Sequence, residues 1–182
     1  VAYTGNMGPA QGMDCRIARA ERMQDRPEAA FLFVGRGADV PRLRALVRDR
    51  ALGNVLFLDE IAASRIPDLL ARCHVGLIAL DPRHTTHNIP GKLLNYLHAG
   101  LPVLARINPG NDLEALIRDQ GIGKVAVGDD DEGLLSMATA LLDDPAMRRE
   151  MADRGHALVQ GMFSPVTTVT QVVDGLSSAP ER

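Results

Sequence analysis

The chain has 182 residues, 46% of them hydrophobic and 24% charged, which is typical of one folded globular domain and excludes a disordered or fibrous protein. The net charge of −3 argues against a general nucleic-acid binder, because that function usually needs a strongly basic face. The longest apolar runs, such as residues 75–80, are too short to cross a bilayer. Cys15 and Cys73 are isolated, which indicates two thiols in a reducing cytoplasm.

Six short apolar runs alternate with helical patterns along the first two thirds of the chain. The runs predict strands at residues 1–4, 31–34, 55–58, 75–80, 102–105 and 124–127. Several of them lack polar alternation, as strands buried on both faces do. Because strands and helices alternate, we expect an α/β fold: a Rossmann-like parallel sheet of about six strands, flanked by helices and joined by right-handed crossovers.

Helical periodicity separates the predicted strands. Apolar residues recur at helical spacing behind Asp39 and behind Ser64, and either residue is a suitable N-cap. A third helix is predicted for residues 90–99. Asn111 and Glu114 have the spacing of a capping box and predict the start of a fourth helix.

The pattern changes to helices alone after residue 127. We expect one helix at about 130–143 and another from Pro145, a proline in the first helical position, to about residue 162. A weaker pattern at 165–176 predicts a last helix. The domain is therefore expected to cover residues 1–176, and residues 177–182 to form a disordered tail.

Glycine and polar residues gather in the loops that follow the predicted strands. In an open parallel sheet, ligands bind beyond the carboxyl ends of the strands. The first loop, residues 5–12, has three glycines that let backbone N–H groups approach an anion, although a tight turn explains this loop alone equally well. The candidate ligand-binding residues in and directly after these loops are Gly5, Asn6, Gly8, Gln11, Gly35, Arg36, Asp59, His87, Pro90, Gly91, Lys92 and Asn95.

Lys92 is the most informative candidate. Pro90 and Gly91 begin a helix whose free N–H groups face the ligand edge, and such groups bind anions. The helix macrodipole disfavours a cation in the first turn, and the chain has only two lysines against eighteen arginines. We therefore predict that Lys92 holds a phosphate. A solvated lysine at an exposed helix start is the competing interpretation, and Asn95, one turn on, either binds a sugar hydroxyl or faces water.

A metal site is considered for His84-x-x-His87 beside Asp81. The segment has the composition of a loop and lacks a fourth ligand at a suitable spacing, so we predict no metal. His87 then either contacts a phosphate or sugar or is an inert surface residue.

In this order, these motifs resemble the C-terminal, donor-binding domain of GT-B fold, family 4 retaining glycosyltransferases. The similarity covers nearly the whole chain, including YTGNMGPAQGMD, FLFVGRGADVPRLRAL, NVLFLDEIAASRIPDLLARCHVGLIAL, IPGKLLNYLHAGLPVLA and LLDDPAMRREMADRGHALVQGMFS. The most similar subgroup assembles bacterial surface polysaccharides and has a P-S/G-K-L-x-E-Y helix start. The resemblance implies a nucleotide-diphosphate sugar donor such as a UDP-sugar, transfer to a polysaccharide or lipopolysaccharide precursor, and no metal or other cofactor.

The resemblance also shows where this sequence differs. Family members commonly have an Arg and a Lys in the first loop and two glutamates eight residues apart in the fourth. Here the first loop offers Asn6 and Gln11, the second glutamate position is Asn95, and the first falls near His87. The resemblance therefore leaves Lys92 as the main cation for the diphosphate.

The chain is expected to be part of a larger protein, because it opens on a valine within a strand-like run. The resemblance implies a preceding N-terminal domain that carries the acceptor site and the acceptor-side catalytic residues, so the fragment alone is expected to be inactive. The full-length hexosyltransferase is expected in the cytoplasm, without a transmembrane segment, and peripheral at the inner face of the membrane. Alternatives are a non-catalytic nucleotide-binding or regulatory Rossmann-like module and a sugar-nucleotide epimerase, although the ligand-edge loops lack a clear acid/base carboxylate pair.

Overall fold

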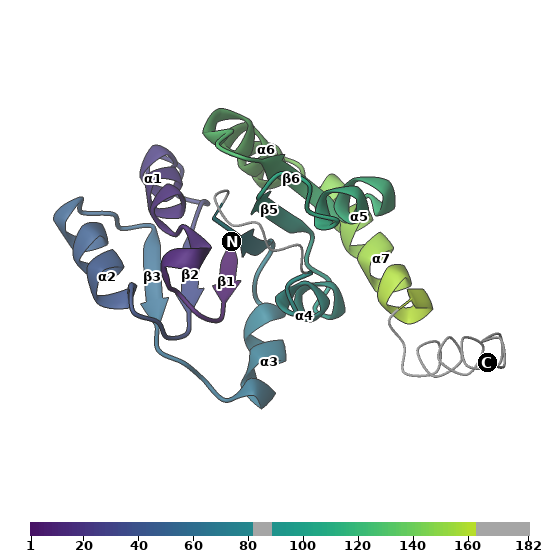
Figure 1. The fold of residues 1–182 in the computed structure, drawn as a ribbon, viewed down its shortest axis with the longest axis horizontal. Helices are drawn as coiled ribbons and strands as arrows, with labels where there is room; N and C mark the ends of the chain where they lie inside the picture. Colours follow the sequence, from purple (N-terminus) through teal and green to yellow (C-terminus); the bar gives the residue numbers. More distant parts are fainter. Residues whose placement is uncertain (82–88, 163–182) are drawn as a thin grey trace, which may run out of the picture.

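The computed structural model describes residues 1–81 and 89–162 (Figure 1). Its six strands form one sheet in the order β3-β2-β1-β4-β5-β6, and all neighbours pair in parallel. The strands are β1 (Ala2–Thr4), β2 (Phe31–Val34), β3 (Val55–Leu58), β4 (Gly76–Ala79), β5 (Val103–Ile107) and β6 (Gly123–Val127). The predicted six-stranded parallel sheet is confirmed, and strand ends differ from the prediction by one or two residues.

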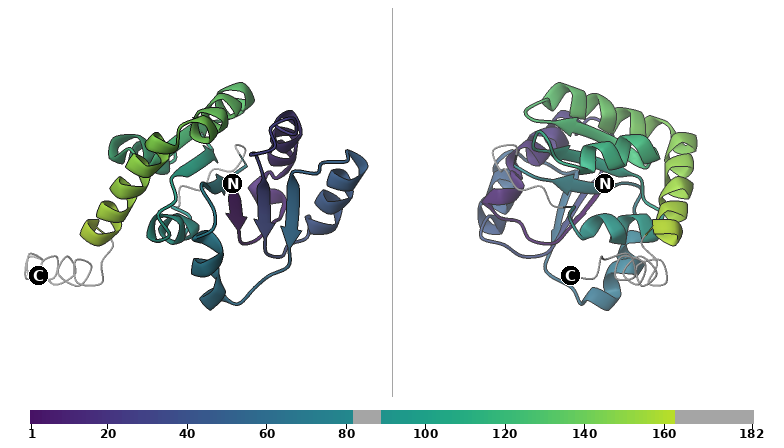
Figure 2. Two further views of the ribbon diagram at one scale, coloured as in Figure 1. Left: turned by 180° about the vertical axis from the view of Figure 1, so that it is seen from behind. Right: turned by 45° about the vertical axis from the view of Figure 1, so that its right-hand side comes forward.

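Helices pack on both faces of this sheet (Figures 1 and 2). One apolar core joins it to α1 (Asp14–Arg22), α2 (Val40–Asp49) and α6 (Asp131–Asp143). The other core joins it to α3 (Ile66–Leu70), α4 (Lys92–His98), α5 (Leu113–Gln120) and α7 (Pro145–Met162). Two 3₁₀ turns, η1 (Pro9–Gln11) and η2 (Ala63–Arg65), lie in the connections.

Tyr96 fixes α4 at the centre of the sheet. Its hydroxyl donates to Leu77 O at 3.1 Å on β4 and accepts from the Thr4 N–H at 3.2 Å on β1. The ring packs directly on Gly76, where a Cβ would lie only 2.3 Å from the ring, so no larger residue fits there without a shift. Because Tyr96 bridges the two central strands, the start of α4 is held at their carboxyl ends.

The last two helices lie where they were predicted, and each begins with a side-chain cap. The Asp130 carboxylate accepts from the Gly133 N–H at 2.8 Å at the start of α6, and the Asp144 carboxylate accepts from the Met147 N–H at 2.8 Å at the start of α7. Each bond satisfies one of the N–H groups that a helix start leaves unpaired. The predictions for residues 165–176 and 177–182 lie outside the described residues.

Two predicted caps are wrong. Ser64 lies inside η2, and α3 begins after it without a side-chain cap, because Pro67 in its first turn has no N–H to satisfy. Asn111 does accept from the Leu113 N–H at 3.0 Å, but Glu114 bonds to an arginine one turn later instead of closing a capping box.

Candidate functional site

The strand order reverses between β1 and β4, so the chain leaves these two neighbours in opposite directions. We call this place the switch point. In open parallel sheets, ligands bind at such a place, beyond the carboxyl ends of the strands. The first loop, residues 5–12, follows β1, and α4 is the next helix after β4. A Cβ added to Gly5 would lie 3.6 Å from the Lys92 Nζ, so the two predicted parts of the site do meet.

The loop after β1 packs backbone against backbone on the loop after β2. Gly5 has φ of +124° and Gly35 of +143°, a region that L side chains rarely adopt. A Cβ on Gly35 would lie 2.1 Å from the Gly5 O, which leaves no room for any side chain. The Met7 N–H also donates to the Arg36 O at 2.8 Å. Gly35 therefore shapes the first loop.

Asn6 and Gln11 close the first loop on itself. The Gln11 Oε1 accepts from the Gly8 N–H at 3.0 Å and from the Asn6 Nδ2 at 3.3 Å. The Tyr3 hydroxyl donates to the Asn6 O at 2.6 Å. The Gly8 N–H, predicted to face an anion, is thus already bonded within the loop, and the Gly5 N–H donates to the Val34 O at 2.9 Å, although Gly5 itself is exposed.

The Lys92 side chain turns inward from the start of α4. Its Nζ lies 3.8 Å from the centroid of the Tyr3 ring, a cation–π contact with a residue of β1. Burial, and then the charge of Arg16, lowers the pKa of Lys92 to about 8. In the part of the chain that the structure describes, Lys92 forms no ion pair with a carboxylate. The competing interpretation, a solvated lysine at an exposed helix start, is therefore wrong. The amine reaches over the edge of the sheet and lies against the Tyr3 ring.

The sequence reasoning missed three buried arginines, and the charge of one of them, Arg16, acts on this amine. Arg16 and Arg19 lie on α1, and Arg106 lies on β5 with its Nε donating to the Gly128 O at 2.8 Å. Their sequence signal was weak, since charged residues in a helix normally face solvent. Arg106 directly follows the predicted strand at 102–105, but it was not among the candidate residues.

The other candidates remain on the carboxyl edge without joining Lys92. Arg36 and Asp59 are exposed and form ion pairs with neighbouring acidic and basic side chains, Glu60 at 3.4 Å and Arg44 at 2.8 Å. Asn95 is exposed on α4. The helix predicted for residues 90–99 is α4, but Pro90 and Gly91 precede it, with Gly91 as its N-cap. His84 and His87 lie outside the described residues.

Residues 1–81 and 89–162 contain neither a metal centre nor a membrane-spanning helix. Within these ranges, no three His, Cys, Asp or Glu side chains come together in a way that could hold a metal ion. No helix there is both long enough and apolar enough to cross a membrane.

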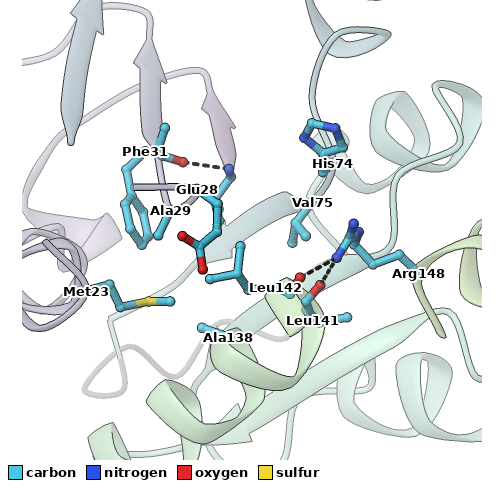
Figure 3. A pocket seen from close by; sticks show the side chains of 12 residues that line it. Met23, Glu28, Ala29, Phe31, His74, Val75, Ala138, Leu141, Leu142 and Arg148 are labelled. Carbon is cyan, nitrogen blue, oxygen red and sulfur yellow. Dashed lines mark hydrogen bonds between the residues drawn. The ribbon is translucent and has the colours of Figure 1, made fainter. Parts of the chain in front are cut away.

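A cavity of about 270 Å³ lies at the opposite edge of the sheet, where strands begin (Figure 3). Phe31 and Val75 line it near the starts of β2 and β4. Its charged groups are already engaged: Arg148 donates to the Leu142 O at 2.8 Å, and Glu28 accepts from Arg26 at 2.8 Å. Because ligands of open parallel sheets bind at the carboxyl edge, we assign the candidate site to the switch point.

Comparison with known proteins identifies the family. The family model described as "Glycosyl transferases group 1" matches residues 1–144. The chain is 31% identical over 100 residues to the colanic acid biosynthesis glycosyl transferase WcaI of Escherichia coli K12, an alignment that covers 55% of this chain and 24% of WcaI. The chain thus spans about a quarter of that relative's length.

Solved structures share the fold. HepE from Anabaena in complex with UDP has a TM-score of 0.80 at 20% identity, over 98% of this chain and 48% of HepE. The C-terminal domain of a group 1 glycosyl transferase family protein, LpcC from Francisella tularensis, has a TM-score of 0.71 at 16% identity, over 90% of this chain and 87% of that domain. The chain therefore belongs to the group 1 glycosyl transferases, and its Rossmann-like fold is that of a GT-B domain of the family 4 type.

Proposed function

We propose that this domain binds the nucleotide-diphosphate sugar donor of a retaining glycosyltransferase. The observation that carries the proposal is the Lys92 amine at the switch point, half-buried beside the exposed Gly5 backbone and without a carboxylate partner among the described residues. A buried cation without a counter-ion is costly, and a bound phosphate removes that cost. The diphosphate of the donor is the anion that fits a glycosyl transferase.

The donor is proposed to be a UDP-sugar, because the structural neighbour HepE was solved with UDP. We assign the diphosphate to Lys92 and to the backbone N–H groups of Gly91 and Lys92, and the ribose or sugar hydroxyls to Asn95. The remaining candidates on the carboxyl edge of the sheet line the approach to the diphosphate. Cations that face a leaving diphosphate stabilise the charge that develops on it, so the reaction does not need a metal ion.

The whole enzyme is proposed to be a hexosyltransferase that acts on a polysaccharide or lipopolysaccharide precursor. WcaI is named for colanic acid biosynthesis, which supports this class of acceptor. We place the acceptor site and acceptor-side catalytic residues on an N-terminal domain, and the enzyme in the cytoplasm, peripheral at the inner membrane face. The purified domain alone should show no sugar transfer, because its site is completed across a cleft. Measurable transfer by the domain, free of host enzymes, would contradict this.

The donor assignment is tested by a thermal-shift screen of UDP, GDP, CMP, dTDP and their sugars. A ligand at about 100 times its Kd stabilises a protein by about 2.7 kcal/mol, which is easily detected. We expect uracil nucleotides to raise the Tm most. If no nucleotide shifts it, donor binding by this domain is wrong; a shift with nucleotides but no discrimination by their sugars would favour a regulatory nucleotide-binding module.

A further inference from the structure

Arg16 is a buried guanidinium without a full set of partners. It lies in the first turn of α1 and is 1% exposed. One terminal nitrogen, Nη1, donates to the Cys15 Sγ, but its Nε and Nη2 have no hydrogen-bond partner among the described residues. A buried charged group that leaves donors unpaired costs free energy, so it calls for an explanation.

The two neighbouring buried arginines differ from Arg16 in one respect. Arg19 pairs with the Asp131 carboxylate at 3.7 Å, and Arg106 forms an ion pair with Asp129. Arg16 has no carboxylate partner among the residues that the structure describes, and its contact with the Cys15 sulfur is the weaker kind that a thiol offers. The positive charge of this cluster is therefore balanced at two of its three guanidinium groups.

Arg16 and Lys92 approach the same place from opposite sides of the sheet. Both interact with Tyr3 of β1: Lys92 lies over its ring, and the charge of Arg16 acts on its hydroxyl. Burial lowers the pKa of Arg16 to about 10, and Arg16 is the charge that lowers the pKa of Lys92. The two cations disfavour each other unless an anion lies near both.

The surrounding groups do not supply that anion. From α1, Cys15 faces Arg16; from β5, Arg106 adds a like charge. After β4, Asp81 is buried against Gly12 and is not among the charges that set the pKa of Lys92. The first loop itself, residues 5–12, contains no charged side chain.

We infer that Arg16 is a second cation of the donor site and acts together with Lys92 on one anionic group, the diphosphate of the donor. This inference rests on the proposed function. Since Arg16 is buried, it is a positioning residue that acts through its charge. The two positive charges of the pair equal the two negative charges on the diphosphate of a nucleotide sugar. In this chain α1 thus supplies the charge that the first loop lacks.

The test is calorimetric titration of UDP, UMP and uridine into the wild type, Arg16→Met and Arg19→Met. Arg19→Met is the matched control, because it removes a buried guanidinium from the same helix that already has a carboxylate partner. We expect Arg16→Met to weaken UDP binding about tenfold or more, the range for losing one charge-assisted contact, and to leave uridine unchanged. Arg19→Met should keep UDP affinity within about threefold.

A pH series separates this role from a structural one. In the wild type, UDP affinity should begin to fall as the pH rises through about 8, because free Lys92 loses its proton there. In Arg16→Met the onset should move to higher pH, since one cause of the lowered pKa is gone. Loss of stability alone would not move it. Unchanged UDP affinity and an unchanged onset in Arg16→Met would overturn the inference.

Two further outcomes are decisive. If Arg16→Met does not fold, Arg16→Lys replaces it, because it keeps the charge. A UDP affinity of Arg16→Lys within about threefold of the wild type supports the inference, whereas a tenfold loss contradicts it. If the wild type binds no nucleotide, the proposed donor function fails, and titration with inorganic pyrophosphate then tests the anion site alone. Pyrophosphate binding by the wild type that is lost in Arg16→Met supports the pair of cations. If the wild type does not bind pyrophosphate either, the inference is overturned.

Discussion

Replacing Lys92 with Met should stabilise the free domain while it weakens donor binding. Methionine has a similar unbranched stem, so the apolar contacts over Tyr3 are kept and only the charge is lost. Folding lowers the pKa of Lys92 from 10.5 to about 8, mainly because burial disfavours the charged amine. At about 1.36 kcal/mol per unit, the charged amine below pH 8 costs up to about 3 kcal/mol.

The pKa of the folded domain reflects every interaction of the charged amine, so the contact with Tyr3 is not subtracted again. The gain expected for Lys92→Met at pH 7 is therefore up to about 3 kcal/mol, or a rise in Tm of up to about 6–12 °C for a domain of this size. UDP affinity should fall about tenfold to a hundredfold. Stability and binding thus change in opposite directions.

The pH dependence has a defined direction. The unfolded chain keeps the lysine proton up to about pH 10.4, whereas the folded domain releases it near pH 8, so wild-type stability should rise between these values. Urea denaturation at pH 7 and at pH 9.5 measures this rise, and Lys92→Met should lack it. Lys124→Met, which changes the only other lysine, is the control and should match the wild type. If Lys92→Met is less stable than the wild type at pH 7, the reasoning about its burial fails.

Three further changes test the site and the fold. Asn95→Glu should preserve or tighten UDP binding, because a carboxylate forms stronger bonds to hydroxyls; unchanged affinity, with the side chain in bulk water in a donor complex, would end the assignment. Gly35→Ala should destabilise the domain by about 4 kcal/mol or more in urea denaturation, because its Cβ would overlap a carbonyl of the first loop, whereas the open position Gly53→Ala should not. Asp144→Ala should cost about 1 kcal/mol through loss of the α7 cap, and the exposed Asp153→Ala should cost less.

The sheet could be predicted from the sequence because its strands are buried on both faces. Residues 76–79 are all buried, as are residues 103–107, so each strand appears in the sequence as an apolar run. Arg106 lies inside β5 nonetheless, and its charge made the predicted strand end two residues too early. Helix starts were less predictable where a proline replaced a capping side chain, as in α3.

The candidate site was only partly predictable. The meeting of Lys92 with the first loop followed from topology, since loops after neighbouring parallel strands share one edge. The inward turn of Lys92 onto Tyr3 did not, because two residues 89 positions apart show no pattern in the sequence. Arg16 was missed for a related reason: α1 has a mostly polar sequence, and the burial of a guanidinium appears only once Tyr3 and Arg106 are placed around it.

Burial of the two cations also determines how donor binding should respond to salt. Charges at the surface are screened beyond about 8 Å at physiological ionic strength, whereas buried charges are screened much less. The affinity lost in Arg16→Met should therefore be nearly the same at about 0.05 M and about 0.5 M NaCl. Arg36, which is 79% exposed by its side chain, is the matched comparison, and any loss in Arg36→Met should shrink strongly at the higher concentration. Titrations of UDP at both concentrations measure the two effects. If the effect of Arg16→Met disappears in high salt, its charge reaches the donor through solvent, and the buried pair with Lys92 is not the diphosphate site.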